Sequence, residues 1–186
     1  MATNTLETYV SVDVETAGPN PGEYALLSIG ACLVSDPKNG FYVELKPTSP
    51  NATQEALAIS RLSIERLMDD GLEPAEALTR FRTWLQTEVP DDRKPIFVAF
   101  NAPFDWMFVN TYFHRFLGYN PFGHAALDVK SYFMGMAGVR WSETTIHHVS
   151  TRYRQKDSLT HHALQDARDQ AILFQMMLDE KKLTPR

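Results

Sequence analysis

Hydrophobic residues in the first quarter of the chain alternate with polar residues or gather in short runs, a pattern typical of β-strands. The runs are TYVSVDV at 8–14, LLSIGACLV at 26–34 and GFYVELKP at 40–47. The turn-forming segments GPNPGE and SDPKNG lie between them. This order predicts a meander of three antiparallel strands.

Helical spacing of the apolar residues dominates the rest of the chain. SIERLMDDG predicts a short helix that ends at Gly71, and EPAEALTRFRTWLQTEV predicts a longer helix with proline in its first turn. After the break PDDRK, the run PIFVAF predicts a buried strand. The elements expected after it are a helix over 104–117, a short strand at ALDV, weaker helices within 131–152 and a final helix over 163–180. Strands followed by alternating helices and strands indicate an α/β fold with a mixed sheet covered by helices.

The composition fits one globular domain over residues 1–186, because 186 residues with 44% hydrophobic content can form a full core. The single cysteine, Cys32, lies in an apolar run, so we expect a buried thiol and a reducing, cytoplasmic location. No signal peptide is recognisable and no apolar run reaches the roughly 18 residues of a membrane span, so no membrane partner is expected. The formal net charge of -5 argues against a broad basic surface for nucleic acid, but not against a small site that carries its own metal ions.

Two acidic residues close the first predicted strand. In VSVDVETAG, Asp13 and Glu15 share one face of the strand, while Val10, Val12 and Val14 share the other. Carboxylates about 7 Å apart repel one another, and a hard divalent cation such as Mg2+ relieves that repulsion. Taken alone, the pair also fits a solvated strand end, so the other acidic motifs decide between the two.

A second acid follows the predicted buried strand. Asp105 lies in FVAFNAPFDWMF, where the chain turns from strand into helix. Loops at the carboxyl ends of strands commonly carry catalytic groups, although the helix dipole also favours an acid near a helix start. The aromatic residues Phe104, Phe108 and Tyr112 recur every fourth residue and are expected in the core.

The third acidic motif opens the last predicted helix, in LTHHALQDARDQAILFQMML. Small and apolar residues from Ala163 to Leu178 form a narrow stripe that is expected to be buried. Asp166 lies nearer that stripe than Asp169, so Asp166 is the acid expected to reach a site at the edge of the core. His161 faces the same site only if it lies in the loop before the first helical turn.

Together these motifs resemble the DEDDh exonucleases, the group that includes RNase T and the proofreading epsilon subunit of bacterial DNA polymerase III. The resemblance rests on an Asp-x-Glu pair, N-A-x-F-D and H-x-x-x-x-D, and it spans nearly the whole chain from Asp13 to Asp166. It implies a ribonuclease H-like fold, with a five-stranded mixed sheet flanked by helices. It also implies metal-dependent 3'-5' exonuclease activity on DNA or RNA, with release of nucleoside 5'-monophosphates.

The same resemblance assigns roles to individual residues. His161 is implied as the general base, and His162 is expected to be a packing or surface residue. A nucleic acid 3' end, most simply a single strand of DNA or RNA, is the implied partner, and RNase T-like relatives often form homodimers. Two divalent cations, Mg2+ or Mn2+, are implied to be held by four acids: Asp13, Glu15, Asp105 and Asp166.

Contacts to the nucleotide are less specific in the sequence. The family often reads D-x-E-T-T-G and often has histidine before N-A-x-F-D, whereas this chain has Ala17 and Phe100 there. Trp106 faces away from the predicted core stripe and could stack on a terminal base. The basic segment TRYRQKD could hold the substrate backbone or could be a solvated loop. The candidate substrate contacts are therefore Thr16, Ala17, Trp106, Arg152, Arg154 and Lys156.

Two other interpretations stay open at this point. Phosphatases of the haloacid dehalogenase type also open with a strand and acids, in the pattern D-x-D-x-[TV]. Here DVET has glutamate at the second acid, and that scheme leaves Asp105 and His161 without a role. A non-catalytic module with a degenerate nuclease fold could bind nucleic acid or a polymerase, but it would not need the expected catalytic residues.

Overall fold

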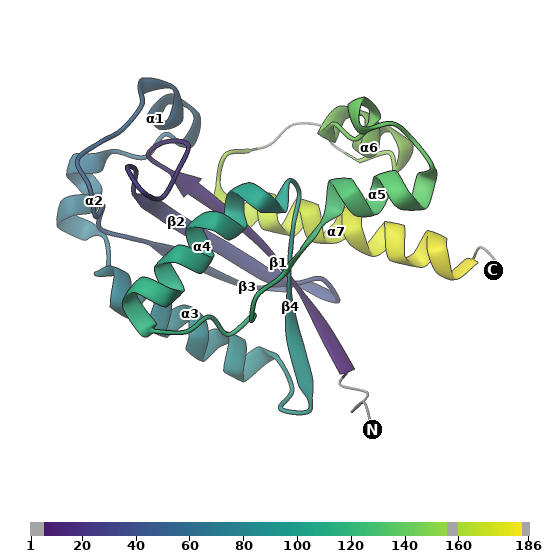
Figure 1. The fold of residues 1–186 in the computed structure, drawn as a ribbon, viewed down its shortest axis with the longest axis horizontal. Coiled ribbons are helices and arrows are strands. Elements are labelled where there is room, and N and C mark those ends of the chain that lie inside the picture. Colours follow the sequence, from purple (N-terminus) through teal and green to yellow (C-terminus); the bar gives the residue numbers. More distant parts are fainter. Residues whose placement is uncertain (1–5, 156–159, 184–186) are drawn as a thin grey trace.

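A mixed sheet of five strands forms the centre of the structure (Figure 1). The computed structural model describes residues 6–155 and 160–183. In the sheet order β3-β2-β1-β4-β5, the first three strands pair antiparallel, β4 is parallel to β1, and β5 is parallel to β4. The strands are β1 (Leu6–Thr16), β2 (Leu26–Leu33), β3 (Asp36–Glu44), β4 (Arg93–Ala99) and β5 (Ala126–Asp128).

Helices cover both faces of this sheet. The helix α7 packs on β1, β2 and β3, whereas α3 and α4 pack on one another and against the opposite face. In Figure 1, α1 and α2 lie at one side of the molecule and α5 and α6 at the other. The helices are α1 (Gln54–Ser60), α2 (Ile64–Asp70), α3 (Pro74–Glu88), α4 (Ala102–Leu117), α5 (Val129–Ala137), the 3-10 turn η1 (Trp141–Glu143), α6 (Ile146–Arg152) and α7 (Ala163–Leu183).

The alternation of residues along β1 separates two cores. Val10, Val12 and Val14 are buried in the core beneath α3 and α4, and a second core lies beneath α7. Burial of each large apolar side chain contributes roughly 1.5–3 kcal/mol, so a shift of β1 by one residue would be strongly unfavourable. The register therefore places Asp13 and Glu15 on the face that α7 covers.

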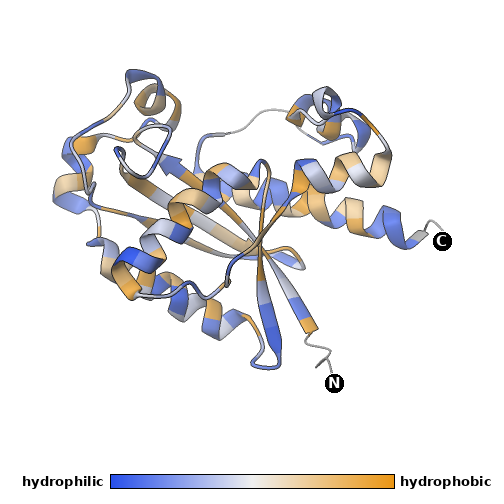
Figure 2. Ribbon diagram, in the orientation of Figure 1, coloured by the Kyte–Doolittle hydropathy of each residue, from blue (hydrophilic) through white to orange (hydrophobic). Residues whose placement is uncertain are grey.

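The strand β4 carries the chain from the surface to the end of β1. Its residues change from exposed at Arg93 and Lys94 to buried from Phe97 to Ala99. Figure 2 shows the same strand passing from hydrophilic to hydrophobic along its length. This gradient fixes the far end of β4 inside the sheet, so α4 begins close to the acidic end of β1.

The three-stranded meander and the mixed sheet predicted from the sequence are confirmed, and several details differ. The helix α1 was not expected, because its sequence QEALAIS buries only Ser60 and so lacks a clear apolar stripe. Its start is set by Thr53, whose hydroxyl accepts a hydrogen bond from the Ala56 N–H at 3.1 Å. The third strand begins at Asp36 rather than at residue 40, and the last helix continues to Leu183 rather than ending at residue 180.

One expectation drawn from the composition also finds a structural counterpart. Cys32 is buried in the core beneath α7, and this burial raises the pKa of its thiol to about 12. Such a thiol stays protonated and unreactive at neutral pH. Within the residues that the structure describes, no helix combines the length and the apolar character needed to cross a bilayer.

Candidate active site

An acidic pocket of about 400 Å³ is lined by residues from the end of β1, the start of α4 and the start of α7. Three of its acids are almost fully buried, with exposed fractions of 8% for Glu15, 5% for Asp105 and 2% for Asp166. The segments that supply these side chains are far apart in the sequence. The residues predicted to be catalytic all line this pocket: Asp13, Glu15, Asp105, His161 and Asp166.

The pairing of β1 with β2 sets the distance between the first acids and α7. Asp13 lies opposite Gly30 of β2. A Cβ atom at Gly30 would lie 2.1 Å from the backbone of Ala163 and of Leu164. The absence of a side chain at Gly30 therefore allows the start of α7 to cross directly over β2, which brings Asp166 next to the acids of β1.

Asp105 is fixed by a hydrogen bond to the backbone of β1. The pairing of β1 with β4 extends only as far as Ser11, and beyond it the Val14 N–H donates to Oδ1 of Asp105 at 3.1 Å. The first turn of α4 is held in turn by Asp128, whose Oδ1 accepts from the Ala102 N–H at 3.0 Å. These bonds tie α4 to both neighbouring strands and leave the Asp105 carboxylate little freedom.

Asp166 holds the segment that carries His161. Its two carboxylate oxygens accept hydrogen bonds at 2.8 Å from the backbone N–H groups of Thr160 and His161 and from the Thr160 hydroxyl. His161 has a left-handed backbone conformation with φ of 56° and lies outside α7, which begins at Ala163. The sequence allowed His161 to face the same site as Asp166 only from the loop before the first turn of α7, and His161 lies in that loop.

A buried glutamine connects Asp13 to the end of β4. Gln170 of α7 accepts a hydrogen bond from the Phe100 N–H at 2.8 Å, and its amide N–H donates to Oδ1 of Asp13 at 2.6 Å. Because the Phe100 N–H can only donate, the carbonyl of Gln170 must face it and the NH2 group must face Asp13. The orientation of Asp13 is therefore determined by two elements besides its own strand.

Crowding of the carboxylates makes their ionisation unfavourable. Burial raises the pKa of Asp13 well above its usual range, and the charges of Asp105, Glu15 and Asp166 raise it further, against the bond from Gln170. Burial and then the charge of Asp166 raise the pKa of Glu15 to about 7. Burial raises the pKa of Asp105 to about 8, although its bond to the Val14 N–H acts in the opposite direction.

Positive charge inside the pocket would relieve this crowding, and the donors fit divalent cations. Glu15, His161 and Asp166 each offer a ligand atom, and these atoms lie within 4.8 Å of one another. Carboxylate oxygens are the ligands that Mg2+ prefers, and Mn2+ accepts both carboxylate and imidazole. The arrangement thus suits cations that bind phosphate oxygens at the same time.

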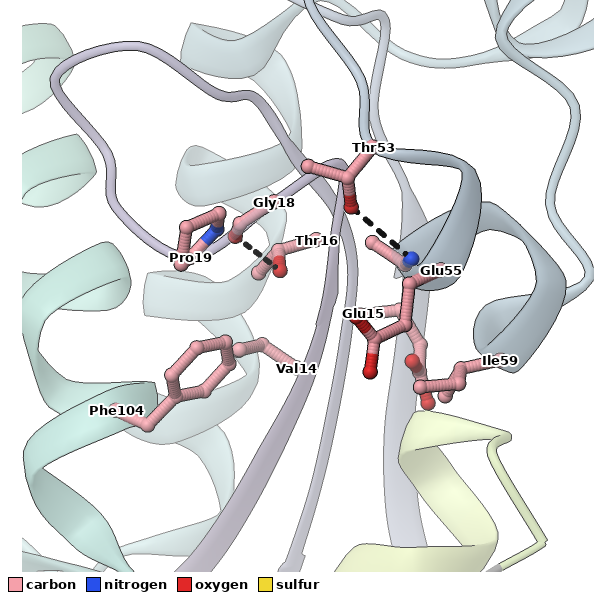
Figure 3. A pocket seen from close by; sticks show the side chains of 10 residues that line it. Val14, Glu15, Thr16, Gly18, Pro19, Thr53, Glu55, Ile59 and Phe104 are labelled. Carbon is pink, nitrogen blue, oxygen red and sulfur yellow. Dashed lines mark hydrogen bonds between the residues drawn. The ribbon is translucent and has the colours of Figure 1, made fainter.

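A second pocket of about 380 Å³ adjoins the acidic one (Figure 3). The two pockets share Val14, Glu15 and Phe104 in their linings. In Figure 3 the Phe104 ring lies on one side of the space and Ile59 of α1 on the other, with Glu15 between them. A flat apolar group attached to a phosphate could therefore lie here while its phosphate faces the acids.

Comparison with known proteins identifies the family. The sequence matches the family described as the 3'-5' exoribonuclease Rv2179c-like domain over residues 8–178. The chain belongs to this exonuclease family. It is 45% identical, over 97% of each chain, to the 3'-5' DNA exonuclease Cap18 of Escherichia coli.

Solved structures give the same fold. The nuclease domain of 3'hExo, described as a DEDDh family member bound to rAMP, superposes with a TM-score of 0.78 at 14% identity, over 96% of this chain and 95% of that one. E. coli Exonuclease I in complex with a dT13 oligonucleotide gives a TM-score of 0.70 at 17% identity, over 94% of this chain and 41% of the other. The ribonuclease H-like fold and the assignment to the 3'-5' exonucleases are thus confirmed, and a phosphatase of the haloacid dehalogenase type is not supported.

Several residues proposed as substrate contacts lie elsewhere in this member of the exonuclease family. Ala17 is fully buried, and its backbone N–H and carbonyl bond to Ala25 and Thr53. Trp106 packs edge-on against Phe97, with ring centroids 5.2 Å apart, rather than lining the acidic pocket. Periodicity along α4 did not reveal that Trp106 packs beside β4, and contact of Ala17 or Trp106 with a nucleotide stays a prediction. Thr16, by contrast, lines the second pocket.

The basic segment at the end of α6 is also displaced from the acidic pocket where the structure describes it. Arg152 forms an ion pair with Glu180 at 2.5 Å, and Glu180 lies 14 residues beyond Asp166, roughly 21 Å along α7. Arg154 is exposed in the turn after α6 and is absent from the lining of both pockets. Lys156 lies outside the described residues.

Other residues of the site were not recognised from the sequence. Gln170 lies four residues after Asp166, one helical turn further on, and this spacing was the available signal. Lys130 lines the acidic pocket from α5, and no motif marked it. The expectation for His162 agrees with its position, since this exposed ring stacks on Tyr42 with centroids 4.5 Å apart.

Proposed function

We propose that this exonuclease removes nucleotides one at a time from the 3' end of single-stranded DNA and releases nucleoside 5'-monophosphates. The observation that carries the proposal is the convergence of four acids and His161 on one pocket from three remote segments of the chain. Each motif alone has a structural explanation, but a solvated strand end would not bury Glu15 and Asp166 next to one another.

We assign the binding of two divalent cations, Mg2+ or Mn2+, to these four acids. The charges of the other three acids all act on Asp13, so Asp13 would hold the cations together with them. When bound, divalent cations would supply positive charge that stabilises the negative charge on the phosphate oxygens and on the attacking and leaving oxygens. The high pKa values of Glu15 and Asp105 support a site that is complete only with such charge.

His161 is assigned as the general base. Hydrolysis of a phosphodiester requires an acceptor for the proton of the attacking water, and a neutral imidazole near pH 7 is suited to that task. The bond from the His161 N–H to Asp166 fixes the backbone at this position. Its side chain lines the acidic pocket, within reach of the place where the phosphate would be held.

The second pocket is assigned to the nucleoside at the 3' end. Its volume of about 380 Å³ lies within the usual range for a small-molecule pocket, and its position beside Glu15 would hold the scissile phosphate at the acids. The Phe104 ring and the Ile59 side chain offer apolar surfaces for either face of a base. E. coli Exonuclease I, which shares the fold, is described in complex with a dT13 oligonucleotide, and this supports a single-stranded end as substrate.

The choice of DNA is supported by the relative with 45% identity, which is named a DNA exonuclease. The family description names an exoribonuclease, so RNA is the second candidate. Digestion of matched DNA and RNA oligomers that carry a label at the 5' end separates the two. Preference for the RNA oligomer would replace the DNA assignment and leave the site assignment intact. A homodimer stays a prediction, which analytical ultracentrifugation tests.

The decisive test of the site uses Asp13→Asn, with Asp169→Asn as control. Asp169 is also an acid of α7, but it pairs with Gln165 away from the pocket. We expect a ladder of shortened oligomers with Mg2+, none with chelator, and none from Asp13→Asn in either condition. Wild-type turnover by Asp13→Asn, with an unchanged circular dichroism spectrum, would overturn the proposal.

A further inference from the structure

The proposed nucleoside pocket adjoins the acidic pocket, and the two share Val14, Glu15 and Phe104 in their linings. The nucleoside pocket extends toward α1. The acidic pocket is also lined by Lys130 of α5 and by Thr145 and Ile146 at the start of α6. In Figure 1, α5 and α6 lie on the other side of the molecule from α1. If the 3' nucleoside lies on the α1 side and its phosphate lies at the acids, the chain on the 5' side of that phosphate must leave past α5 and α6.

A lysine and a tryptophan lie together on this exit side. The ammonium group of Lys130 sits 4.3 Å from the centre of the Trp141 ring. Trp141 belongs to η1 and is 52% exposed, so much of its ring is open to solvent. Of the described residues that line the acidic pocket, Lys130 is the one with a permanent positive charge.

The turn that carries Trp141 is held in place. The α5 helix ends at Gly138 in a left-handed conformation, with φ of 66°, and the chain then enters η1. The Arg140 N–H donates to the Glu143 carboxylate at 3.0 Å, and the hydroxyl of Thr144 donates to the Trp141 carbonyl at 2.8 Å. A large exposed aromatic ring on a fixed turn loses little conformational entropy when a flat ligand stacks on it.

We propose that Lys130 and Trp141 form the binding surface for the single-stranded nucleic acid on the 5' side of the scissile phosphate. Trp141 stacks on a base, and Lys130 contacts a backbone phosphate while its charge remains over the indole ring. This pair compensates locally for a net charge of -5 that would otherwise repel the strand. The inference rests on the proposed function, since it assumes that the acidic pocket holds the phosphate.

Substrates of different length distinguish the contribution of this surface from that of the catalytic site. The p-nitrophenyl ester of thymidine 5'-monophosphate fills the nucleoside pocket and the acidic pocket but has no nucleotide on the 5' side. A single-stranded DNA oligomer of twelve nucleotides would also reach α5 and η1. Loss of one base-stacking ring changes binding by roughly 5- to 150-fold. We therefore expect Trp141→Ala to lower kcat/KM for the oligomer at least fivefold more than for the ester, and Trp141→Phe to restore most of the loss.

Tyr119 provides the matched control. It is an exposed aromatic residue that follows the far end of α4, and that end lies roughly 18 Å along the helix from Asp105. Tyr119→Ala should change kcat/KM for neither substrate. If Trp141→Ala lowers kcat/KM equally for both substrates, or for neither, the assignment of the binding surface is wrong while the proposed function stands. If wild-type protein with Mg2+ cleaves neither substrate, the proposed function itself fails.

The phosphate contact proposed for Lys130 is tested by the dependence of kcat/KM on salt concentration. Removal of one phosphate contact on a single strand should reduce the slope of log(kcat/KM) against log salt concentration by roughly 0.7. We expect this reduction for Lys130→Gln with the oligomer, whereas Lys94→Gln, at the exposed start of β4, should keep the wild-type slope. An unchanged slope for Lys130→Gln would contradict the phosphate contact.

Discussion

The amide N–H of Gln170 donates a hydrogen bond of 2.6 Å to Oδ1 of Asp13, although the two residues are 157 positions apart. The carbonyl of the same amide accepts from the Phe100 N–H at 2.8 Å. The side chain is 3% exposed, so water cannot replace either partner readily. Gln170 therefore links the central acid of the pocket to the junction between β4 and α4, and it acts as a positioning residue.

Replacing Gln170 with leucine should lower kcat on a DNA oligomer by roughly 10- to 100-fold, because a hydrogen bond to a charged group is worth about 1.5–3 kcal/mol. Titration calorimetry with Mn2+ should show weaker binding, which a purely structural defect distant from Asp13 would not cause. Gln170→Glu should be worse, since it adds a carboxylate beside Asp13. The control is Gln175→Leu, which removes a surface bond to Asp179 on the same helix. Equal activity of Gln170→Leu and wild type would refute the positioning role.

His161 and His162 are adjacent but should differ sharply in their effect on turnover. His161→Ala removes the assigned proton acceptor, and general base catalysis contributes typically about 10²- to 10⁴-fold. His162→Ala removes a ring that stacks on Tyr42 at the surface, so kcat should stay within about twofold. Single-turnover rates over a range of pH check this, because loss of the base should also remove a limb of the wild-type profile. The reverse ranking of the two variants would assign the base to His162.

The acids could be predicted from the sequence because each lies in one of three short motifs, and the order and spacing of these motifs are recognisable. The alternation of residues in a strand was enough to predict that Asp13 and Glu15 share a face. The apolar stripe of one helix was enough to predict that Asp166 lies at the edge of the core. Gln170 and Gly30 matter through contacts with distant segments, and no local period reveals such contacts. The same limit explains why the packing of Trp106 against Phe97 could not be predicted.

The metal-free protein should lose stability as the pH rises from about 5 to 8. A carboxyl group whose pKa is higher in the folded than in the unfolded chain stabilises the fold below its unfolded value of about 4, and this contribution is lost as the pH rises through the folded value. Glu15 and Asp105, with pKa values of about 7 and about 8, define that window. Thermal unfolding in chelator should therefore give a lower Tm at pH 8 than at pH 5.5.

Divalent cations should reverse this dependence, because they bind the ionised carboxylates of the folded state. The rise in Tm on adding Mn2+ should be larger at pH 8 than at pH 5.5. Glu15→Gln should weaken both the fall in Tm in chelator and the response to Mn2+, whereas Asp169→Asn should change neither. A metal-free Tm that rises between pH 5.5 and pH 8 would contradict the assigned crowding of buried carboxylates.

Gly30→Ala should damage the site by moving a helix rather than by removing a catalytic group. The added methyl would meet the backbone of Ala163 and Leu164 at 2.1 Å, a contact that only a shift of α7 can relieve. Overpacking of this kind costs typically about 1–3 kcal/mol, and displacement of Asp166 should lower kcat as well as Tm. Gly135→Ala is the control, because no atom lies within 4 Å of its added Cβ and alanine favours the helix α5. Thermal unfolding and oligomer digestion check both variants, and a Gly30→Ala protein with wild-type Tm and turnover would show that α7 does not depend on this close approach.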